Sequence, residues 1–184
     1  MNNKNDIHIH LHKKPSKKEQ LVPMTLLPGD WRKDFTELEC QVMIAEALNT
    51  CVYNDDMKIA GYLITRRRLC LILLADPAHV AEQLQQFYKE LRKEIAHRLQ
   101  RRKNIHDLIF EKQELTAVDK HAALFIKFPM QNYMLVSLLT GRKVELPYYS
   151  PYLARLQDRV NAQNFCSAMD YTGAKSPVMV TLLK

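Results

Sequence analysis

The stretch Gly61–Leu73, GYLITRRRLCLIL, decides the fold that we expect for this chain. Two apolar segments flank a short cationic link, and short apolar runs bounded by polar residues are typical of buried strands. We therefore predict a β-hairpin formed by Met57–Ile64 and Leu69–Ala75, with Thr65–Arg68 as its turn. The three consecutive arginines in that turn need a physical explanation.

Helical patterns lie on both sides of this hairpin. Before it, the apolar residues of Phe35–Tyr53 recur with a period near 3.6, and Asp34 or Thr36 can cap the first turn. After it, Asp76-Pro77 is a suitable helix start, because proline is tolerated in the first turn. The apolar stripe of this second helix consists of Val80, Leu84, Phe87, Leu91, Ile95 and Leu99.

Two more segments are candidates for strands. Asp6–Lys13, DIHIHLHK, alternates apolar residues with histidines, which is the two-residue period of a half-buried strand. Leu108–Leu115 is the candidate for the last strand. We expect irregular structure in Leu21–Asp34, because this segment contains two prolines and a glycine.

The expected order is strand–helix–strand–strand–helix–strand, which fits an α+β, ferredoxin-like split βαβ domain with an antiparallel sheet. Later segments indicate an α-rich C-terminal extension, and Val178–Leu183 is either an edge strand or a docked tail. We therefore divide the chain into a domain of residues 1–116 and a mostly helical extension of residues 117–184 packed on it. The helical patterns of the extension are Ala117–Phe128, Asn132–Leu139 and Tyr152–Asn164.

The composition favours some classes of function and gives no support to others. The 184 residues carry a net charge of +7, which favours a polyanionic partner and nucleic acid first. The four cysteines form no CxxC pair, which argues against a zinc ribbon. No apolar run is long enough for a bilayer and no signal-peptide pattern is present, so we expect a cytoplasmic protein without a membrane partner. Nucleotide hydrolases, serine hydrolases and zincins have no supporting motif.

The order and spacing of these segments resemble the single-tyrosine transposases of the HUH class, particularly the REP-associated type. The similarity lies in IHIHLHK, then KDFTELECQVMIAEAL, then AGYLITRRRLCLILL followed by DP, and it covers roughly residues 6–103. The resemblance implies a bacterial DNA-binding protein that works as a monomer or a homodimer. In that family, a His-hydrophobe-His motif on a strand holds a divalent ion, and a tyrosine on the following helix is the nucleophile.

The sequence departs from the family at both of these places. The two histidines fall on Arg68 and Cys70. A guanidinium group has no acceptor lone pair, and a thiolate is a poor ligand for magnesium or manganese. The active site is therefore degenerate, and we expect no cofactor. The tyrosine position falls near Leu91, so Tyr88 is either the catalytic nucleophile or an aromatic residue on the flank of the apolar stripe.

The cationic turn has three interpretations. Arg66, Arg67 and Arg68 form a solvated turn, or they bind DNA phosphates, or they belong to a metal site remade with other ligands. The last interpretation would use the histidine face of the first candidate strand to hold a divalent metal (Mg, Mn or Zn), unless that face is simply polar and solvated. Its candidate ligands are His8, His10 and His12.

The basic end of the long helix is a second candidate for DNA contact. Arg98, Arg101 and Arg102 lie near one another across a turn. Cations at this end of a helix also suit the helix dipole and commonly face solvent, so both interpretations stay open.

Three hypotheses follow. The first is a catalytically degenerate, transposase-like protein that binds single-stranded or hairpin DNA without cleaving it. The second is an active, metal-dependent enzyme that nicks single-stranded DNA by transesterification with Tyr88. The third is a protein-interaction module whose basic surface is incidental.

Overall fold

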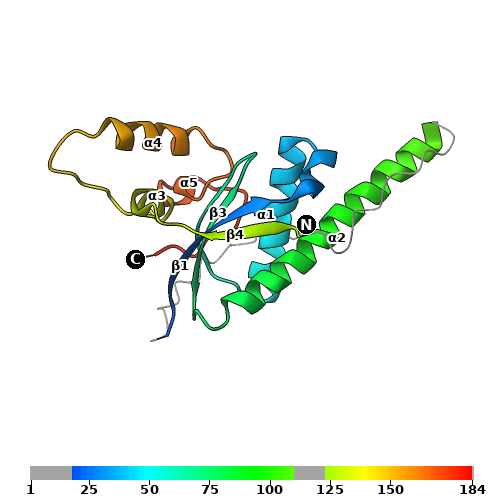
Figure 1. Ribbon diagram of the computed structural model, residues 1–184, viewed down its shortest axis with the longest axis horizontal. Helices are drawn as coiled ribbons and strands as arrows, with labels where there is room; N and C mark the ends of the chain where they lie inside the picture. Colours follow the sequence, from blue (N-terminus) through cyan, green and yellow to red (C-terminus); the bar gives the residue numbers. More distant parts are fainter. Residues whose placement is uncertain (1–17, 110–122, 184) are drawn as a thin grey trace, which may run out of the picture.

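A four-stranded antiparallel sheet with helices on both of its faces forms the centre of the molecule (Figure 1). The computed structural model describes residues 18–109 and 123–183. The strands are β1 (Gln20–Pro28), β2 (Ile59–Ile64), β3 (Leu69–Ala75) and β4 (Phe125–Pro129). Their order in the sheet is β2-β3-β1-β4, so β3 and β1 are central. The expected α+β class with an antiparallel sheet is confirmed.

The helices form two groups. The long helices α1 (Glu37–Asn54) and α2 (Val80–Ile109) cover one face of the sheet, which we call the inner face. The short helices α3 (Tyr133–Leu139), α4 (Pro151–Asn161) and α5 (Ala168–Tyr171) lie on the opposite, outer face (Figure 1). A short 3-10 helix, η1 (Asp30–Asp34), connects β1 to α1.

The hairpin β2–β3 is buried along its whole length. Leu71 and Leu73 pack among the α1 and α2 side chains, whereas Cys70 and Ile72 pack on the outer face. Two covered faces explain why both strands are continuous apolar runs without alternation. The predicted hairpin, with its turn at residues 65–68, is confirmed.

The prediction of irregular structure over Leu21–Asp34 was wrong for most of that segment, because β1 occupies Gln20–Pro28. Its prolines fit the strand for a positional reason. Pro23 precedes the stretch of β1 that pairs with β4, and Pro28 is the last strand residue. Proline is tolerated at such positions because fewer ladder hydrogen bonds are needed there.

The prediction of helix over Ala117–Phe128 was wrong at its end, where β4 begins at Phe125. The start of β4 is fixed beside the end of β1. The backbone N–H of Gly29 and the indole Nε1 of Trp31 both donate to the Leu124 carbonyl oxygen, each at 2.9 Å. These long-range bonds favour an extended chain at a place where local sequence preference favours helix.

Several other predictions can be compared with the structure. Four helices were predicted correctly, because α1, α2, α3 and α4 occupy the expected segments. Leu108 and Ile109 belong to α2 and not to a strand, and the rest of that candidate lies outside the described residues. The first candidate strand, Asp6–Lys13, lies outside them too. The division at residue 116 stays a prediction, although β4 follows that boundary and joins the same sheet.

The C-terminal segment is a docked tail without a strand. Asn49 on α1 binds it through both ends of its amide. Its Nδ2 donates to the Pro177 carbonyl oxygen and its Oδ1 accepts from Met179 N–H, both at 2.8 Å. Thr181 N–H donates to the Ile59 carbonyl oxygen at 2.8 Å, so the tail also contacts the outside of β2.

Candidate nucleic-acid interface

The turn of the β2–β3 hairpin presents three exposed arginines, Arg66, Arg67 and Arg68. Thr65 N–H donates to the Arg68 carbonyl oxygen at 2.9 Å, and Arg68 N–H donates to Thr65 Oγ1 at 3.3 Å. Within the described residues, no ion pair involves any of the three. The turn is therefore an ordered backbone with three cations that no carboxylate of the described residues neutralises.

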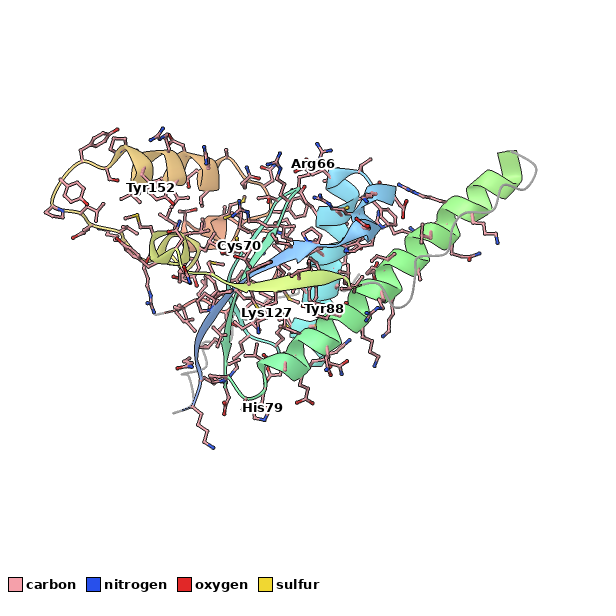
Figure 2. The ribbon with its side chains drawn as sticks, viewed as in Figure 1. Arg66, Cys70, His79, Tyr88, Lys127 and Tyr152 are labelled. Carbon is pink, nitrogen blue, oxygen red and sulfur yellow. The ribbon has the colours of Figure 1, made fainter. Side chains whose placement is uncertain are left out.

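A fourth arginine supports this turn from the neighbouring η1. The Nη1 atom of Arg32 donates to the Arg66 carbonyl oxygen at 2.8 Å. The Arg66 side chain lies at the tip of the hairpin (Figure 2). We call Arg66, Arg67 and Arg68 the arginine turn.

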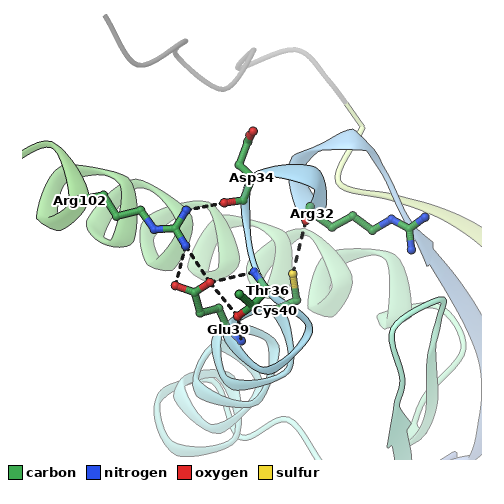
Figure 3. Close-up of polar contacts among 6 residues, drawn as sticks. All are labelled: Arg32, Asp34, Thr36, Glu39, Cys40 and Arg102. Atoms are coloured by element: carbon green, nitrogen blue, oxygen red, sulfur yellow. Dashed lines mark hydrogen bonds and ion pairs between the residues drawn. The ribbon is translucent and has the colours of Figure 1, made fainter. Parts of the chain in front are cut away.

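Arg102, another arginine predicted to contact DNA, joins α2 to the start of α1 (Figure 3). Its Nη2 lies 2.7 Å from both carboxylate oxygens of Glu39, and its Nη1 donates to the Asp34 carbonyl oxygen. The guanidinium carbon also lies 4.8 Å from the centre of the Phe35 ring. This side chain has a structural role in holding the two long helices together.

Glu39 belongs to the same network. It forms a capping box with Thr36, whose N–H donates to Glu39 Oε2 at 2.8 Å. That bond, with the Arg102 ion pair, lowers the pKa of Glu39 to about 2. The carboxylate is therefore charged at neutral pH and is already bound by a cation.

Arg98 and Arg101 line a hollow between α1 and α2, together with His97, Glu46 and Glu94. Arg98 Nη2 lies 3.4 Å from Glu46 Oε2, so α1 supplies a partner to this arginine as well. Burial and the neighbouring Glu46 carboxylate raise the pKa of Glu94. The carboxyl groups of Glu46 and Glu94 lower the positive potential of the hollow and so reduce its attraction for phosphate. Of the six arginines predicted to contact DNA, Arg98 and Arg102 have carboxylate partners, whereas the three in the turn have none among the described residues.

Tyr88 lies on the inner face, where its ring stacks on Phe125 with centroids 5.8 Å apart and an interplanar angle of 26°. Half-burial raises the pKa of its hydroxyl, which disfavours a tyrosinate nucleophile. Cys70 is buried on the outer face, and burial raises the pKa of its thiol. The structure therefore does not bring Tyr88 together with Cys70.

The described residues contain no group of three or more histidine, cysteine, aspartate or glutamate side chains that could hold a metal. The predicted ligands His8, His10 and His12 lie outside this part of the chain. The assignment of a metal to them stays a prediction.

Sequence reasoning missed a partly open area on the outer face. Ile126 and Phe128 on β4 are 58% and 45% exposed, and they pair in register with Leu27 and Thr25 on β1. We call these four residues the open face. The segment Phe125–Pro129, FIKFP, has no apolar–polar alternation that could have indicated this surface, and we predicted helix there.

No family model matches this chain, and neither a curated protein nor a solved structure matches it. Among residues 18–109 and 123–183, no helix has the length and apolar character that crossing a membrane requires.

Proposed function

We propose that this protein binds single-stranded or hairpin DNA without cleaving it, and that the arginine turn contacts the phosphates. The observation that carries the proposal is the exposure of three guanidinium groups on one closed turn without carboxylate partners among the described residues. Each guanidinium can bind a phosphate with two parallel hydrogen bonds. Such binding would break no ion pair within this part of the protein.

The charge of the whole chain supports the same proposal. A net charge of +7 attracts polyanions over a range set by the salt concentration. The contrast with α2 is informative, because Arg98 and Arg102 have glutamate partners and the turn arginines do not. Binding would therefore be centred on the hairpin turn. We expect the protein to act in the cytoplasm of a bacterium, as a monomer or a homodimer.

The chemistry of three residues supports the part of the proposal that DNA is bound but not cleaved. Arg68 cannot ligate a metal, and Cys70 is a buried thiol with a raised pKa. Tyr88, the candidate nucleophile, packs on the inner face of the sheet. A fixed positive charge at Arg68 would keep the attraction for phosphate while contributing no activated nucleophile.

The test is binding of labelled single-stranded, hairpin and duplex DNA over a salt series, with either manganese or EDTA present. We expect affinity to fall as salt rises, to be unaffected by EDTA, and to leave no covalent product. Replacing all three turn arginines by glutamine should reduce the slope of log affinity against log salt by about 2, since each single-strand phosphate contact contributes roughly 0.7.

A control variant with the same change of charge makes this test specific. Arg92, Arg142 and Arg159 are exposed arginines outside the turn, so their replacement by glutamine also removes three charges. We expect this control to retain most of the affinity. Equal losses in both variants would assign binding to net charge alone. No binding by the unmodified protein at low salt would overturn the proposal and favour a protein-interaction module.

A further inference from the structure

We infer that the open face stacks unpaired bases, so that the DNA held by the arginine turn is single-stranded. This inference rests on the proposed function, since the turn supplies the phosphate contacts. The inference specifies which part of the DNA is recognised, namely the flat faces of unpaired bases. Recognition of this kind favours single strands over duplexes. The carrying observation is an exposed aromatic and aliphatic surface at the end of the sheet from which the arginine turn projects, whose cations have no ion-pair partner among the described residues.

The outer face of the sheet is covered only in part. The outer-face cluster buries Cys70 and Ile72 on β3, with Leu135 and Leu139 of α3 as members of the same cluster. Toward β4 this cover ends, and Phe128 is 45% exposed. The cover therefore stops between the central strands and β4.

Phe128 lies in one cross-strand row with Thr25 and Cys70. Thr25 pairs with Phe128 on one side and with Cys70 on the other. The next row in the direction of the hairpin turn contains Ile126 and Leu27. Apolar side chains exposed in adjacent rows near a sheet edge are costly for a protein to leave uncovered, and such patches mark binding surfaces.

The arginine turn follows the same end of the sheet as the second row. The β1–β3 ladder ends with Leu26 opposite Leu69, and Arg68 directly precedes Leu69 in the chain. Arg68 is close enough to Cys70 for its charge to act on that thiol, which supports its placement on the outer side. Two strand spacings separate β3 from β4 across β1, or about 10 Å. A single strand lying over the open face therefore brings its phosphates within reach of the turn.

Single-stranded DNA is the ligand that fits both the open face and the arginine turn. A flat aromatic ring can stack on any unpaired base, and neighbouring cations follow the backbone. In a duplex the base faces are stacked on one another, so only base edges and phosphates are accessible. A duplex would therefore use the arginine turn alone, and a single strand would use both surfaces.

The experiment compares Phe128→Leu with the unmodified protein, using a labelled oligothymidylate and a duplex of equal length. Leucine keeps an apolar side chain and removes the aromatic ring. We expect about a tenfold loss of affinity for the single strand, no change for the duplex, and an unchanged salt slope, because phosphate contacts are retained. Phe128→Tyr should restore binding of the single strand.

Tyr149→Leu is the matched control, since this tyrosine is 80% exposed and lies in the loop before α4. It should bind like the unmodified protein. Equal single-strand affinities for Phe128→Leu and the unmodified protein would overturn the stacking inference and leave the proposed function standing. Failure of the unmodified protein to bind any DNA would overturn both.

A second measurement needs no substitution and covers the case in which Phe128→Leu does not fold. The unmodified protein is irradiated with a single strand that contains 5-iododeoxyuridine, and the crosslinked peptide is mapped by mass spectrometry. We expect crosslinks within β4, at residues 125–129. Crosslinks confined to other segments would overturn the inference.

Discussion

Cys70 and Tyr88 lie on opposite faces of the same sheet. Cys70, on the central strand β3, is buried on the outer face among α3 and the segment that follows α4. Tyr88, on α2, stacks on Phe125 at the inner face. The sheet therefore separates the Tyr88 hydroxyl, the candidate nucleophile, from the Cys70 thiol. A phosphate at the outer face would be out of reach of the Tyr88 hydroxyl.

The substitution Tyr88→Phe should have little effect. It keeps the ring that stacks on Phe125 and removes a hydroxyl to which the described residues offer no hydrogen bond. We expect the free energy of unfolding to change by less than about 0.5 kcal/mol. DNA affinity should be unchanged, and neither protein should form a covalent DNA adduct with manganese.

Tyr88→Ala is the matched comparison, because it removes the stacked ring as well. We expect a loss of about 2–3 kcal/mol in the free energy of unfolding, measured by urea denaturation, since the ring is only half-buried. A covalent adduct that forms with the unmodified protein and disappears in Tyr88→Phe would contradict our account and support the nicking hypothesis.

Acid should weaken the contact between α1 and α2 through Glu39. Its folded pKa of about 2 lies below the ordinary value of 4.5, so the unfolded chain binds the proton more readily. The stabilisation from this carboxylate is complete above about pH 4.5 and is lost as the pH falls toward 2. Glu39→Gln should lower the free energy of unfolding by about 1 kcal/mol at pH 7 and flatten its dependence on pH over that window.

The control for this prediction is Glu37→Gln, an exposed residue in the same first turn of α1. Urea unfolding at pH 7, 4.5 and 3 compares the two variants with the unmodified protein. Glu37→Gln should follow the unmodified protein closely. An unaltered pH profile for Glu39→Gln would mean that the bonds from Thr36 and Arg102 do not stabilise the folded state.

Ser167→Ala removes a single oxygen atom, yet it should clearly lower the free energy of unfolding. This hydroxyl is fully buried, accepts from Tyr62 N–H at 2.8 Å and lies 2.7 Å from the Leu139 carbonyl oxygen, to which it can donate. Alanine would leave both backbone groups without that partner, which costs about 1–3 kcal/mol. Thermal and urea denaturation measure the loss, with Ser137→Ala on α3 as the comparison. Similar stability of the two variants would refute the bridging role of Ser167.

Gly61→Ala should disturb the contact between β2 and α3. A Cβ atom at residue 61 would lie 2.6 Å from the Leu139 carbonyl oxygen and 3.1 Å from Ile72 Cδ1. Because the closer neighbour is backbone, the strain can be relieved only if α3 moves away from the sheet. We expect a loss of about 1–3 kcal/mol and faster hydrogen exchange of the α3 amides. Unchanged exchange in α3 would show that the helix accommodates a methyl group.

The sequence was sufficient to predict elements whose signal is local. The helix α1 shows it well, because the capping box of Thr36 and Glu39 and a regular apolar stripe define its start and its buried side. The hairpin β2–β3 was equally clear, since long apolar runs bounded by polar residues have few alternatives. The arginine turn could be located for the same reason.

Elements that depend on distant partners were not predicted. Prolines concealed β1, and a local helical pattern concealed β4. Both are stabilised by pairing with strands far away in the chain, including the bonds from Gly29 and Trp31 to Leu124. Propensity could not reveal these strands, because the pairings that favour them join residues roughly 50 positions apart between β1 and β3 and roughly 100 apart between β1 and β4.

The sequence by itself determined the class of fold, the long helices, and a hairpin with three cations at its turn. Only the tertiary structure decided which cations are free, since carboxylates on α1 bind Arg98 and Arg102 and no described residue binds the turn in this way. It also decided that Tyr88 and Cys70 are on opposite sides of the sheet and that Phe128 on β4 is exposed. The physical reason is that charge pairing and burial depend on residues distant in sequence, whereas hydrophobic periodicity and capping depend on neighbours.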